Sequence, residues 1–297
     1  MNRERAEALA GGGAFVSTDW EAAVRHPEVD AVVIATTHDL LASITAEAAA
    51  AGKHVLVEKP AACRARELDA AVAACQRTGA LVRIGFNHRY HRAFRKAREI
   101  FESGALGELM FIRGRYGHGG RPGYDREWRA DPERSGGGEL IDQGIHLIDL
   151  ARWFLGDFSC VLGRAHTYFW NMPVEDNGFL LLETARNQVA FLHASWTEWK
   201  NLFSFEIAGS IGKLEISGLG GSYGVERLTW YKMSAALGHP ETQAWEYPMA
   251  DDSWEVECAA FLDDIRLGRQ PQPGVADAQA ALRIVEQVYA SSMDTRQ

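Results

Sequence analysis

The chain has 297 residues, of which 46% are hydrophobic, so it can bury one large core or two ordinary ones, and this composition argues against disorder. Lys and Arg number 31 against 40 Asp and Glu, for a formal net charge of -9, and the basic residues are scattered, which argues against a nucleic-acid partner. The four cysteines form no C-x-x-C pair, and no run approaches the roughly 18 apolar residues of a membrane span, so we expect a cytoplasmic protein without a signal peptide or membrane anchor.

The first part of the chain alternates apolar runs with helical segments. Helical composition over residues 2–10 ends at glycines 11–13, and a short helix is expected over 20–26. Strands are predicted at DAVVIA (30–35), HVLV (54–57) and 81–86, the first two as strands buried on both faces, with alanine-rich helices ending at Gly52 and spanning 63–77. This alternation predicts β-α-β crossovers and a parallel sheet.

After residue 86 the pattern changes to long strands. A charged helix is expected over 91–102, a strand over 108–116 and a Gly- and Pro-rich loop over 118–135. Further strands are expected at 160–170, 177–184, 188–197, 202–208, 213–217 and 226–233, and helices at 254–266 and 276–291. Several of these strands alternate apolar and polar residues, as one-sided antiparallel strands do. The second part is therefore predicted to be α+β, with an open, mostly antiparallel sheet and flanking helices.

Lys59 closes one of the predicted parallel strands. Glu58-Lys59-Pro60 follows the apolar run 54–57, so the lysine lies at the carboxyl end of a strand, where open α/β sheets place their ligands. The following proline confines Lys59 to an extended backbone, which fixes the direction of its side chain. A lysine after a strand is usually only a surface charge, but this context favours a role in stabilising a developing alkoxide.

A second chemical pattern lies on the helix predicted to begin near Glu139. Asp142 and His146 stand four residues apart, so their side chains share one face of the helix, and Asp149 extends that face. A carboxylate one turn away can hold a histidine in one tautomer and raise its pKa, which suits a general base. The alternatives are a helix-stabilising pair and a satisfied, partly buried histidine.

A metal site is a further alternative for these residues. His146 with Asp142, His88 or His118 could supply nitrogen and oxygen ligands. Catalytic zinc usually takes three protein ligands, and the sequence has no H-E-x-x-H or comparable signature. We therefore predict no metal.

Six stretches of the sequence carry a resemblance to known proteins: VDAVVIAT (29–36), AGKHVLVEKPAA (51–62), IGFNHRY (84–90), SGALGEL (103–109), WRADPERSGGGELIDQGIHLIDLARWFLG (128–156) and FLDDIRLGRQP (261–271). Together they resemble the Gfo/Idh/MocA family, the relatives of glucose-fructose oxidoreductase and inositol dehydrogenase. They occur in the family's order and cover nearly the whole chain. As a set they are highly specific, although each alone is weak.

The resemblance implies two domains and three catalytic residues. It implies an incomplete Rossmann-like dinucleotide-binding domain over 1–86, and a substrate-binding and dimerisation domain over 87–297. Lys59 falls on the family's E-K-P lysine, which approaches the nicotinamide and the reacting hydroxyl. Asp142 and His146 fall on its D-x-x-x-H pair, with His146 the proton acceptor and Asp142 a substrate hydrogen-bond partner.

Residues for the cofactor, NAD or NADP, are implied in the same way. Thr36, Thr37 and His38 fall on the turn that lies along the cofactor, although the family often has proline where this chain has Thr37. Glu58 and Lys59 also face the cofactor.

Arg89 and Arg129 fall in segments that line the family's substrate site, so they are expected to bind substrate together with Asp142 and His146. The exposed face of the second sheet is implied to form a homodimer or homotetramer.

The departure from the family is in the phosphate loop. Family members open with a strand, a G-x-G-x-x-G turn that binds pyrophosphate and a second strand ending in an acidic residue, but this sequence has no complete match. The nearest, Gly117-His118-Gly119, has Pro122 where the last glycine should be. By this comparison roughly 35 residues of the family's first β-α-β unit are absent. The explanations are a start site placed too late, which we favour, a natural truncation or a cut chain.

The sequence therefore predicts an NAD(P)-dependent oxidoreductase acting on a secondary alcohol of a sugar, nucleotide sugar or cyclic polyol, with cofactor binding impaired in the chain as written. The alternative is a non-catalytic sugar-binding or assembly protein derived from the same scaffold. An in-frame glycine-loop segment upstream of Met1 in the genomic DNA favours the enzyme, and an immediate stop codon favours the alternative.

Overall fold

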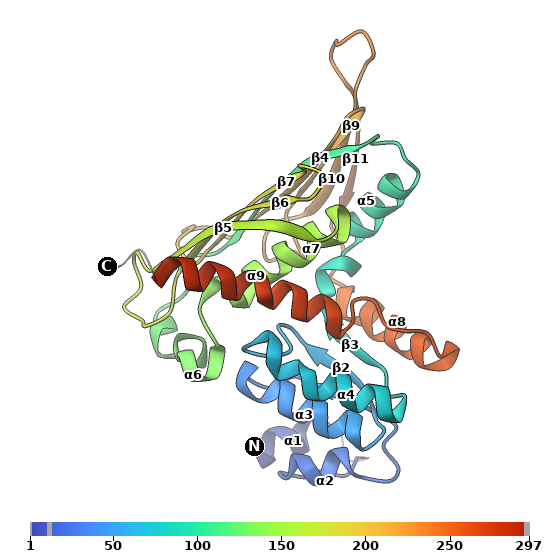
Figure 1. Ribbon diagram of the computed structural model, residues 1–297, viewed down its shortest axis with the longest axis vertical. Helices are drawn as coiled ribbons and strands as arrows, with labels where there is room; N and C mark the ends of the chain where they lie inside the picture. The colour runs from blue at the N-terminus through green and yellow to red at the C-terminus, as the bar shows by residue number, and fades with distance from the viewer. Residues whose placement is uncertain (1, 11–13, 294–297) are drawn as a thin grey trace.

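Two sheets of different size organise the computed structural model, which describes residues 2–10 and 14–293 (Figure 1). The smaller sheet has three parallel strands in the order β1-β2-β3. Its elements are α1 (Arg3–Ala10), α2 (Trp20–Val24), β1 (Ala31–Ile34), α3 (His38–Ala50), β2 (His54–Glu58), α4 (Asp69–Thr78) and β3 (Val82–Gly85). The prediction of a parallel sheet built from β-α-β crossovers is confirmed.

Two details of this sheet differ from the sequence prediction. β1 is not buried on both faces, since Val33 is 66% exposed. Among the described residues β1 pairs only with β2, so it lies at an edge of the sheet. The helix predicted over 63–77 begins later, since residues Ala65–Leu68 form a 3-10 turn before α4. The predicted stop at glycines 11–13 lies outside the described residues.

The larger sheet has eight strands in the order β11-β10-β9-β8-β4-β7-β6-β5. Neighbouring strands are antiparallel except β4 and β7, which are parallel, so the prediction of a mostly antiparallel sheet is confirmed. Its strands are β4 (Leu109–Gly117), β5 (Phe158–His166), β6 (Asn177–Thr184), β7 (Val189–Ser195), β8 (Leu202–Gly209), β9 (Gly212–Ser217), β10 (Glu226–Lys232) and β11 (Glu241–Tyr247). The sequence analysis missed β11, because this edge strand buries no side chain and so lacks an apolar pattern.

Helices cover one face of the larger sheet and leave the other open (Figure 1). They are α5 (Arg92–Glu102), α7 (Ile145–Leu155) and α9 (Val275–Met293), and α9 runs between the two sheets. The helix predicted from Glu139 starts with a π-helical turn, Leu140–Gly144, that continues into α7. The predicted loop after β4 contains short helical turns and α6 (Pro132–Ser135).

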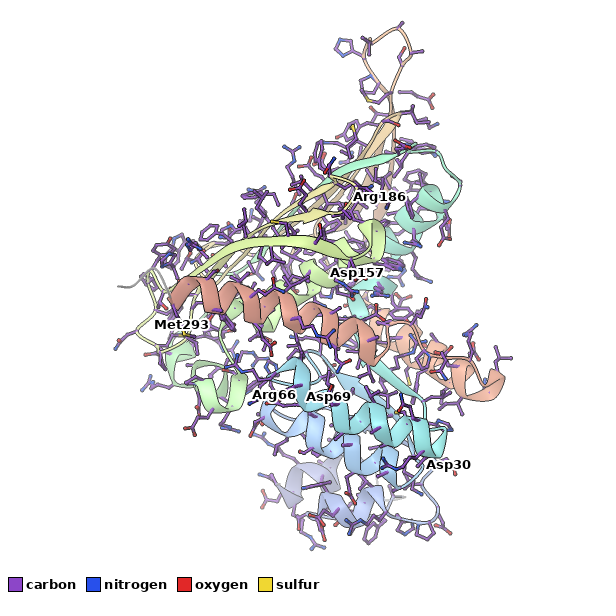
Figure 2. The ribbon with its side chains drawn as sticks, in the orientation of Figure 1. Asp30, Arg66, Asp69, Asp157, Arg186 and Met293 are labelled. Carbon is purple, nitrogen blue, oxygen red and sulfur yellow. The ribbon has the colours of Figure 1, made fainter. Side chains whose placement is uncertain are left out.

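The end of the chain packs against the smaller sheet. After α8 (Ser253–Leu267), the amide of Ile84 in β3 donates to the carbonyl of Pro273 at 3.1 Å. On α9, Gln279 Nε2 donates to Asp69 Oδ1 at 2.8 Å, at the junction below α9 where Figure 2 labels Asp69. These contacts fix the smaller sheet against the helical layer, and the domain division at residue 86 stays a prediction.

Candidate active site

A cavity of about 680 Å³ lies where the carboxyl end of β2 meets the turn after β3, the π-helical turn and the end of β4. Glu58 and Lys59 follow from β2, and Asp142 and His146 come from the segment that leads into α7. The remaining lining residues are Asn87, His88, His91, Tyr116, His118, Gly120, Arg121, Tyr124, Arg129, Gln143, Asn201, Leu219, Gly220, Ser222, Tyr223, Asp251 and Trp254. All three predicted catalytic side chains therefore face one cavity.

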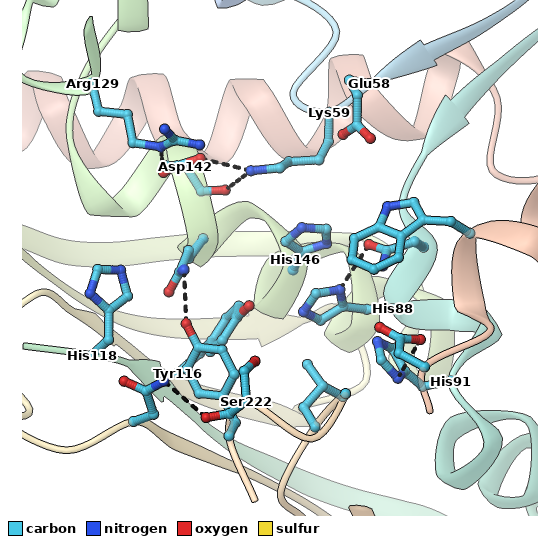
Figure 3. Close-up of a pocket in the computed structure, with 18 of the residues that line it drawn as sticks. Glu58, Lys59, His88, His91, Tyr116, His118, Arg129, Asp142, His146 and Ser222 are labelled. Atoms are coloured by element: carbon cyan, nitrogen blue, oxygen red, sulfur yellow. Dashed lines mark hydrogen bonds and ion pairs between the residues drawn. The ribbon is translucent and has the colours of Figure 1, made fainter. Parts of the chain in front are cut away.

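Lys59 and Asp142 form an ion pair in the wall of this cavity (Figure 3). Its Nζ donates to Asp142 Oδ1 at 2.7 Å and to the backbone carbonyl of Asp142 at 2.6 Å. An ammonium group has three N–H donors, so one remains beyond the two that Asp142 receives. The lysine is therefore held in one direction while keeping a donor for a ligand.

Asp142, which is buried, is the centre of a three-charge group with Lys59 and Arg129. Its second oxygen, Oδ2, accepts a hydrogen bond from Arg129 Nε at 2.8 Å. Burial alone would raise the pKa of Asp142, but the adjacent Lys59 and Arg129 cations outweigh it and hold the pKa well below its usual range. Asp142 thus stays ionised, with both oxygens engaged.

His146 does not have the environment predicted from its spacing. Burial and then the positive charge of Lys59 lower its pKa well below the usual value, and the opposing effect of Asp142 is smaller. Asp142 does act to raise this pKa, but the prediction of a raised net pKa is wrong, because burial and Lys59 outweigh it. The Asp142 oxygens bind Lys59 and Arg129, so Asp142 does not hold the His146 tautomer. His146 is a neutral imidazole in this cavity.

The ring of His146 stacks on that of His88. Their centroids lie 3.7 Å apart with the planes inclined by 15°. Phe86 and Tyr116 meet the His146 ring edge-on at 6.0 and 6.5 Å. His146 Nδ1 is buried without a hydrogen-bond partner among the described residues.

The two predicted arginines have different surroundings. Arg129 lines the cavity, and its guanidinium also lies over the Trp128 ring at 4.6 Å from the ring centre. Arg89 is not a lining residue: its Nε and Nη2 bind the two oxygens of buried Asp149 at 2.8 and 2.6 Å, and Nη2 also binds Asp277 at 3.2 Å. The structure thus corrects the placement of Arg89, and of Asp149, to a buried ion-pair cluster beside the site.

The predicted cofactor residues lie at the carboxyl ends of β1 and β2. Thr36 and Thr37 lead from β1 into α3, and the Thr37 hydroxyl donates to Asp39 Oδ1 at 2.5 Å. His38 is buried, and its Nδ1 donates to the Ser135 carbonyl at 2.8 Å; burial lowers the pKa of His38 to about 4. Burial likewise raises the pKa of Glu58, which lines the cavity.

The sequence analysis missed the aromatic wall of the cavity. Tyr116 at the end of β4 contacts Tyr223, with ring centres 5.0 Å apart, and Gln143 Nε2 donates to Tyr223 Oη at 3.1 Å. These residues lie 27 to 107 positions apart in the printed numbering, and no local pattern links them. Within the described residues, no group of three or more His, Cys, Asp or Glu is arranged to hold a metal ion.

Two family descriptions match this chain. One, described as the oxidoreductase family with an NAD-binding Rossmann fold, matches residues 1–86. The other, the GFO/IDH/MocA C-terminal domain, matches residues 94–215. None of the helices in the described part of the chain could cross a membrane.

Individual relatives agree with these matches. Levoglucosan dehydrogenase of Pseudarthrobacter phenanthrenivorans is 33% identical over 172 residues, which cover 57% of this chain and 44% of that protein, so the match spans less than half of the relative. Inositol 2-dehydrogenase of Rhizobium meliloti is 25% identical over 304 residues, covering 98% of this chain and 87% of that protein. A solved structure of levoglucosan dehydrogenase in complex with NADH has a TM-score of 0.87 at 25% identity, covering 99% of this chain and 86% of that chain.

Proposed function

This chain belongs to the Gfo/Idh/MocA oxidoreductase family, and we propose that it transfers a hydride between NAD or NADP and a secondary alcohol of a sugar, nucleotide sugar or cyclic polyol. The observation that carries the proposal is that Lys59, Asp142 and His146 line one cavity beside the carboxyl end of β2. The names of the relatives, which include dehydrogenases of levoglucosan and inositol, support the substrate class.

The residues at the ends of β1 and β2 fit a nicotinamide cofactor. The N-cap residue of α3, Thr37, makes no side-chain capping bond within the described residues, and a helix N-terminus of this kind favours an anionic group; the Leu40 amide already donates to the Thr37 carbonyl, so His38 and Asp39 would supply the amides. Glu58 and Lys59 would lie beside the nicotinamide and Thr36, Thr37 and His38 along its ribose phosphate. When bound, the cofactor supplies the group that accepts a hydride from the carbinol carbon.

The chain's own residues then handle charge and the proton. The free donor of Lys59 binds the substrate oxygen and stabilises the negative charge that develops on it. Neutral His146 accepts the hydroxyl proton, which an imidazolium could not do. Ionised Asp142 keeps Lys59 and Arg129 in place and balances one of their charges.

A substrate screen tests the proposed function. Levoglucosan, myo-inositol and a panel of aldoses are each offered with NAD⁺ or NADP⁺, and the absorbance of reduced nicotinamide is followed. We expect turnover of at least one cyclic polyol or sugar that is lost in the H146Q variant. Binding of these sugars with no turnover by any cofactor would favour the non-catalytic alternative.

Cofactor affinity gives a separate prediction. The sequence contains no complete G-x-G-x-x-G loop, and each charge-assisted hydrogen bond to phosphate that such a loop would make contributes roughly 1.5 to 3 kcal/mol. The 297-residue chain should therefore bind NADH at least about a hundredfold more weakly than the same chain preceded by an in-frame strand and glycine loop, since two lost bonds are sufficient. Isothermal titration of both forms measures the difference, and equal affinities would contradict it.

The open face of the larger sheet supports the homo-oligomer in the proposal. Three apolar side chains on neighbouring strands form a continuous row: Leu162 pairs with Leu181, which pairs with Phe191. They are 58%, 45% and 47% exposed, and exposed apolar patches of this kind mark association surfaces.

All four cysteines are free thiols, which supports the proposed cytoplasmic location.

Replacing Phe191 by aspartate tests this surface. Burying the new carboxylate against a second copy would leave it unpaired, so we expect F191D to sediment as a monomer at micromolar concentration while the unchanged chain is a dimer or tetramer. L237D is the control, because Leu237 is 90% exposed in the loop between β10 and β11 and away from the row. A dimer that survives in F191D, or that is lost equally in L237D, would place the interface elsewhere.

A further inference from the structure

His88 is a second buried histidine in the cavity wall, and the reaction steps above do not use it. It belongs to the 3-10 turn Asn87–Tyr90 that follows β3, and it is 5% exposed. Its ring is the one on which His146 stacks, with centroids 3.7 Å apart and planes inclined by 15°. Figure 3 shows the two imidazoles side by side, with Lys59 and Asp142 on the far side of His146.

The protonation of His88 follows from its neighbours. In the structure Asn87 Nδ2 donates to Ser253 Oγ at 2.9 Å. With the amide in this orientation, Asn87 Oδ1 faces His88 Nδ1 at 3.1 Å and accepts a hydrogen bond from it. His88 thus carries its proton on Nδ1, while its buried Nε2 keeps a free lone pair and has no partner among the described residues.

Three further aromatic rings contact His88. His91 meets it edge-on with centroids 5.4 Å apart, Tyr116 lies at 5.3 Å and Phe203 at 6.0 Å. His91 is itself fixed by Glu226 Oε2, at 2.9 Å from its Nδ1. The His88 ring is therefore a rigid, uncharged surface under His146.

This surface matters because His146 has few other contacts that fix its ring. The charged and titratable groups that face His146 are Lys59 from the end of β2, Asp142 from its own segment, His88 and His91 from the turn after β3, and Tyr116 from β4. Asp142 binds Lys59 and Arg129, and His146 Nδ1 has no hydrogen-bond partner within the described residues. The ring plane of His146 is thus held by stacking on His88, the nearest ring, together with the edge-on contacts of Phe86 and Tyr116.

We infer that His88 is the positioning residue for His146: its neutral, locked imidazole holds the His146 ring in plane and its π face supports the positive charge that His146 gains with the substrate proton. A cation over an aromatic face is stabilised by the ring quadrupole, most strongly where water is excluded. Two adjacent imidazolium rings would repel, so the stacked pair does not carry two protons, and a neutral His88 is what allows His146 to take one. This role rests on the proposed function of His146.

Two substitutions of His88 separate the aromatic face from mere volume. H88F keeps a flat ring against His146, whereas H88L keeps apolar bulk without one. We expect kcat of H88L to fall about tenfold with KM changed less than about threefold, and H88F to recover most of that loss. H26L is the matched control, because His26 lies after α2, outside the cavity lining, and its kinetics should equal those of the unchanged chain.

A second readout does not depend on turnover. Carbon-13 relaxation of the His146 ring, assigned by its loss in H146Q, reports the order of that ring in the full chain. We expect order near the value of about 0.85 for rigid backbone in the unchanged chain and in H88F, and below about 0.6 in H88L. If H88L does not fold, S253A decides, because freeing the Asn87 amide should loosen His88 and lower the order of the His146 ring as well.

Equal ring order in H88L and H88F, or an unchanged ring in S253A when H88L cannot be used, would overturn the inference. Equal losses of kcat in H88F and H88L would also overturn it, by showing that the imidazole nitrogens and not the face are needed. If the unchanged chain oxidises no alcohol, the proposed function fails while the relaxation result still decides whether His88 holds His146.

Discussion

Alanine in place of Lys59 is expected to lower kcat at least about a hundredfold, which corresponds to about 2.7 kcal/mol of lost transition-state stabilisation. The ammonium is the donor nearest the ionised Asp142, and it keeps one N–H free for the substrate oxygen. Its removal also leaves the buried Asp142 carboxylate with Arg129 as its remaining cation. The loss should appear in kcat more than in KM, because charge on the oxygen develops mainly in the transition state.

Lys53 provides the control for this substitution. It precedes β2, at the opposite end of the strand from Lys59, and its Nζ donates to the His26 carbonyl at 3.1 Å. K53A should therefore keep kcat within about twofold, as expected for surface substitutions. Turnover of K59A equal to that of K53A would remove Lys59 from the mechanism.

Glutamine in place of His146 is the second substitution with a large expected effect, again a loss of kcat of at least about a hundredfold. Glutamine keeps a polar side chain of similar reach, but its amide cannot accept the hydroxyl proton, and general-base catalysis typically contributes 10²- to 10⁴-fold. H26Q, a histidine substitution outside the cavity, should have no effect. Retention of kcat in H146Q would show that another group takes the proton.

The pH dependence of the unchanged chain tests the same residue. Burial and the charge of Lys59 lower the pKa of His146, so its neutral, proton-accepting form persists below the ordinary histidine value of about 6.5. We therefore expect kcat/KM for alcohol oxidation to stay level as the pH falls from 8 through about 6.5, and to decline only below that range. A decline centred at the ordinary value, in a profile measured with a saturating cofactor, would mean that His146 is solvated and not buried as described.

The local pattern of apolar, polar and turn residues was enough to predict most of the helices and strands. Alternating apolar residues marked β8, and the E-K-P turn marked the end of β2, because strand periodicity and turn chemistry depend on neighbouring residues. The sequence pattern did not indicate β11, whose residues are exposed or half-buried and which pairs with β10 through its backbone. It also overestimated the burial of β1, because a sequence run does not show which strand lies at an edge.

The electrostatics of the site could not be read from spacing. Asp142 and His146 are four residues apart, yet the partners of Asp142 are Lys59 and Arg129, which lie 83 and 13 positions from it. The resemblance to the family predicted that Arg89 lines the substrate site. Its guanidinium instead binds Asp149 and Asp277 in a buried cluster. Charged groups from several elements compete for each ion pair. The group that is closest in the sequence is therefore not always the partner.

The amino-acid sequence by itself predicted that one sheet is parallel and the other mostly antiparallel, and it singled out Lys59, Asp142 and His146, which the structure places at one cavity, as candidates for the proposed chemistry. Tertiary structure alone decided that Asp142 serves Lys59 and Arg129, that His146 is neutral, and that His88 lies under its ring. The reason is physical: backbone conformation is set largely by adjacent residues, whereas burial, ion pairing and ring stacking depend on groups that only folding brings together.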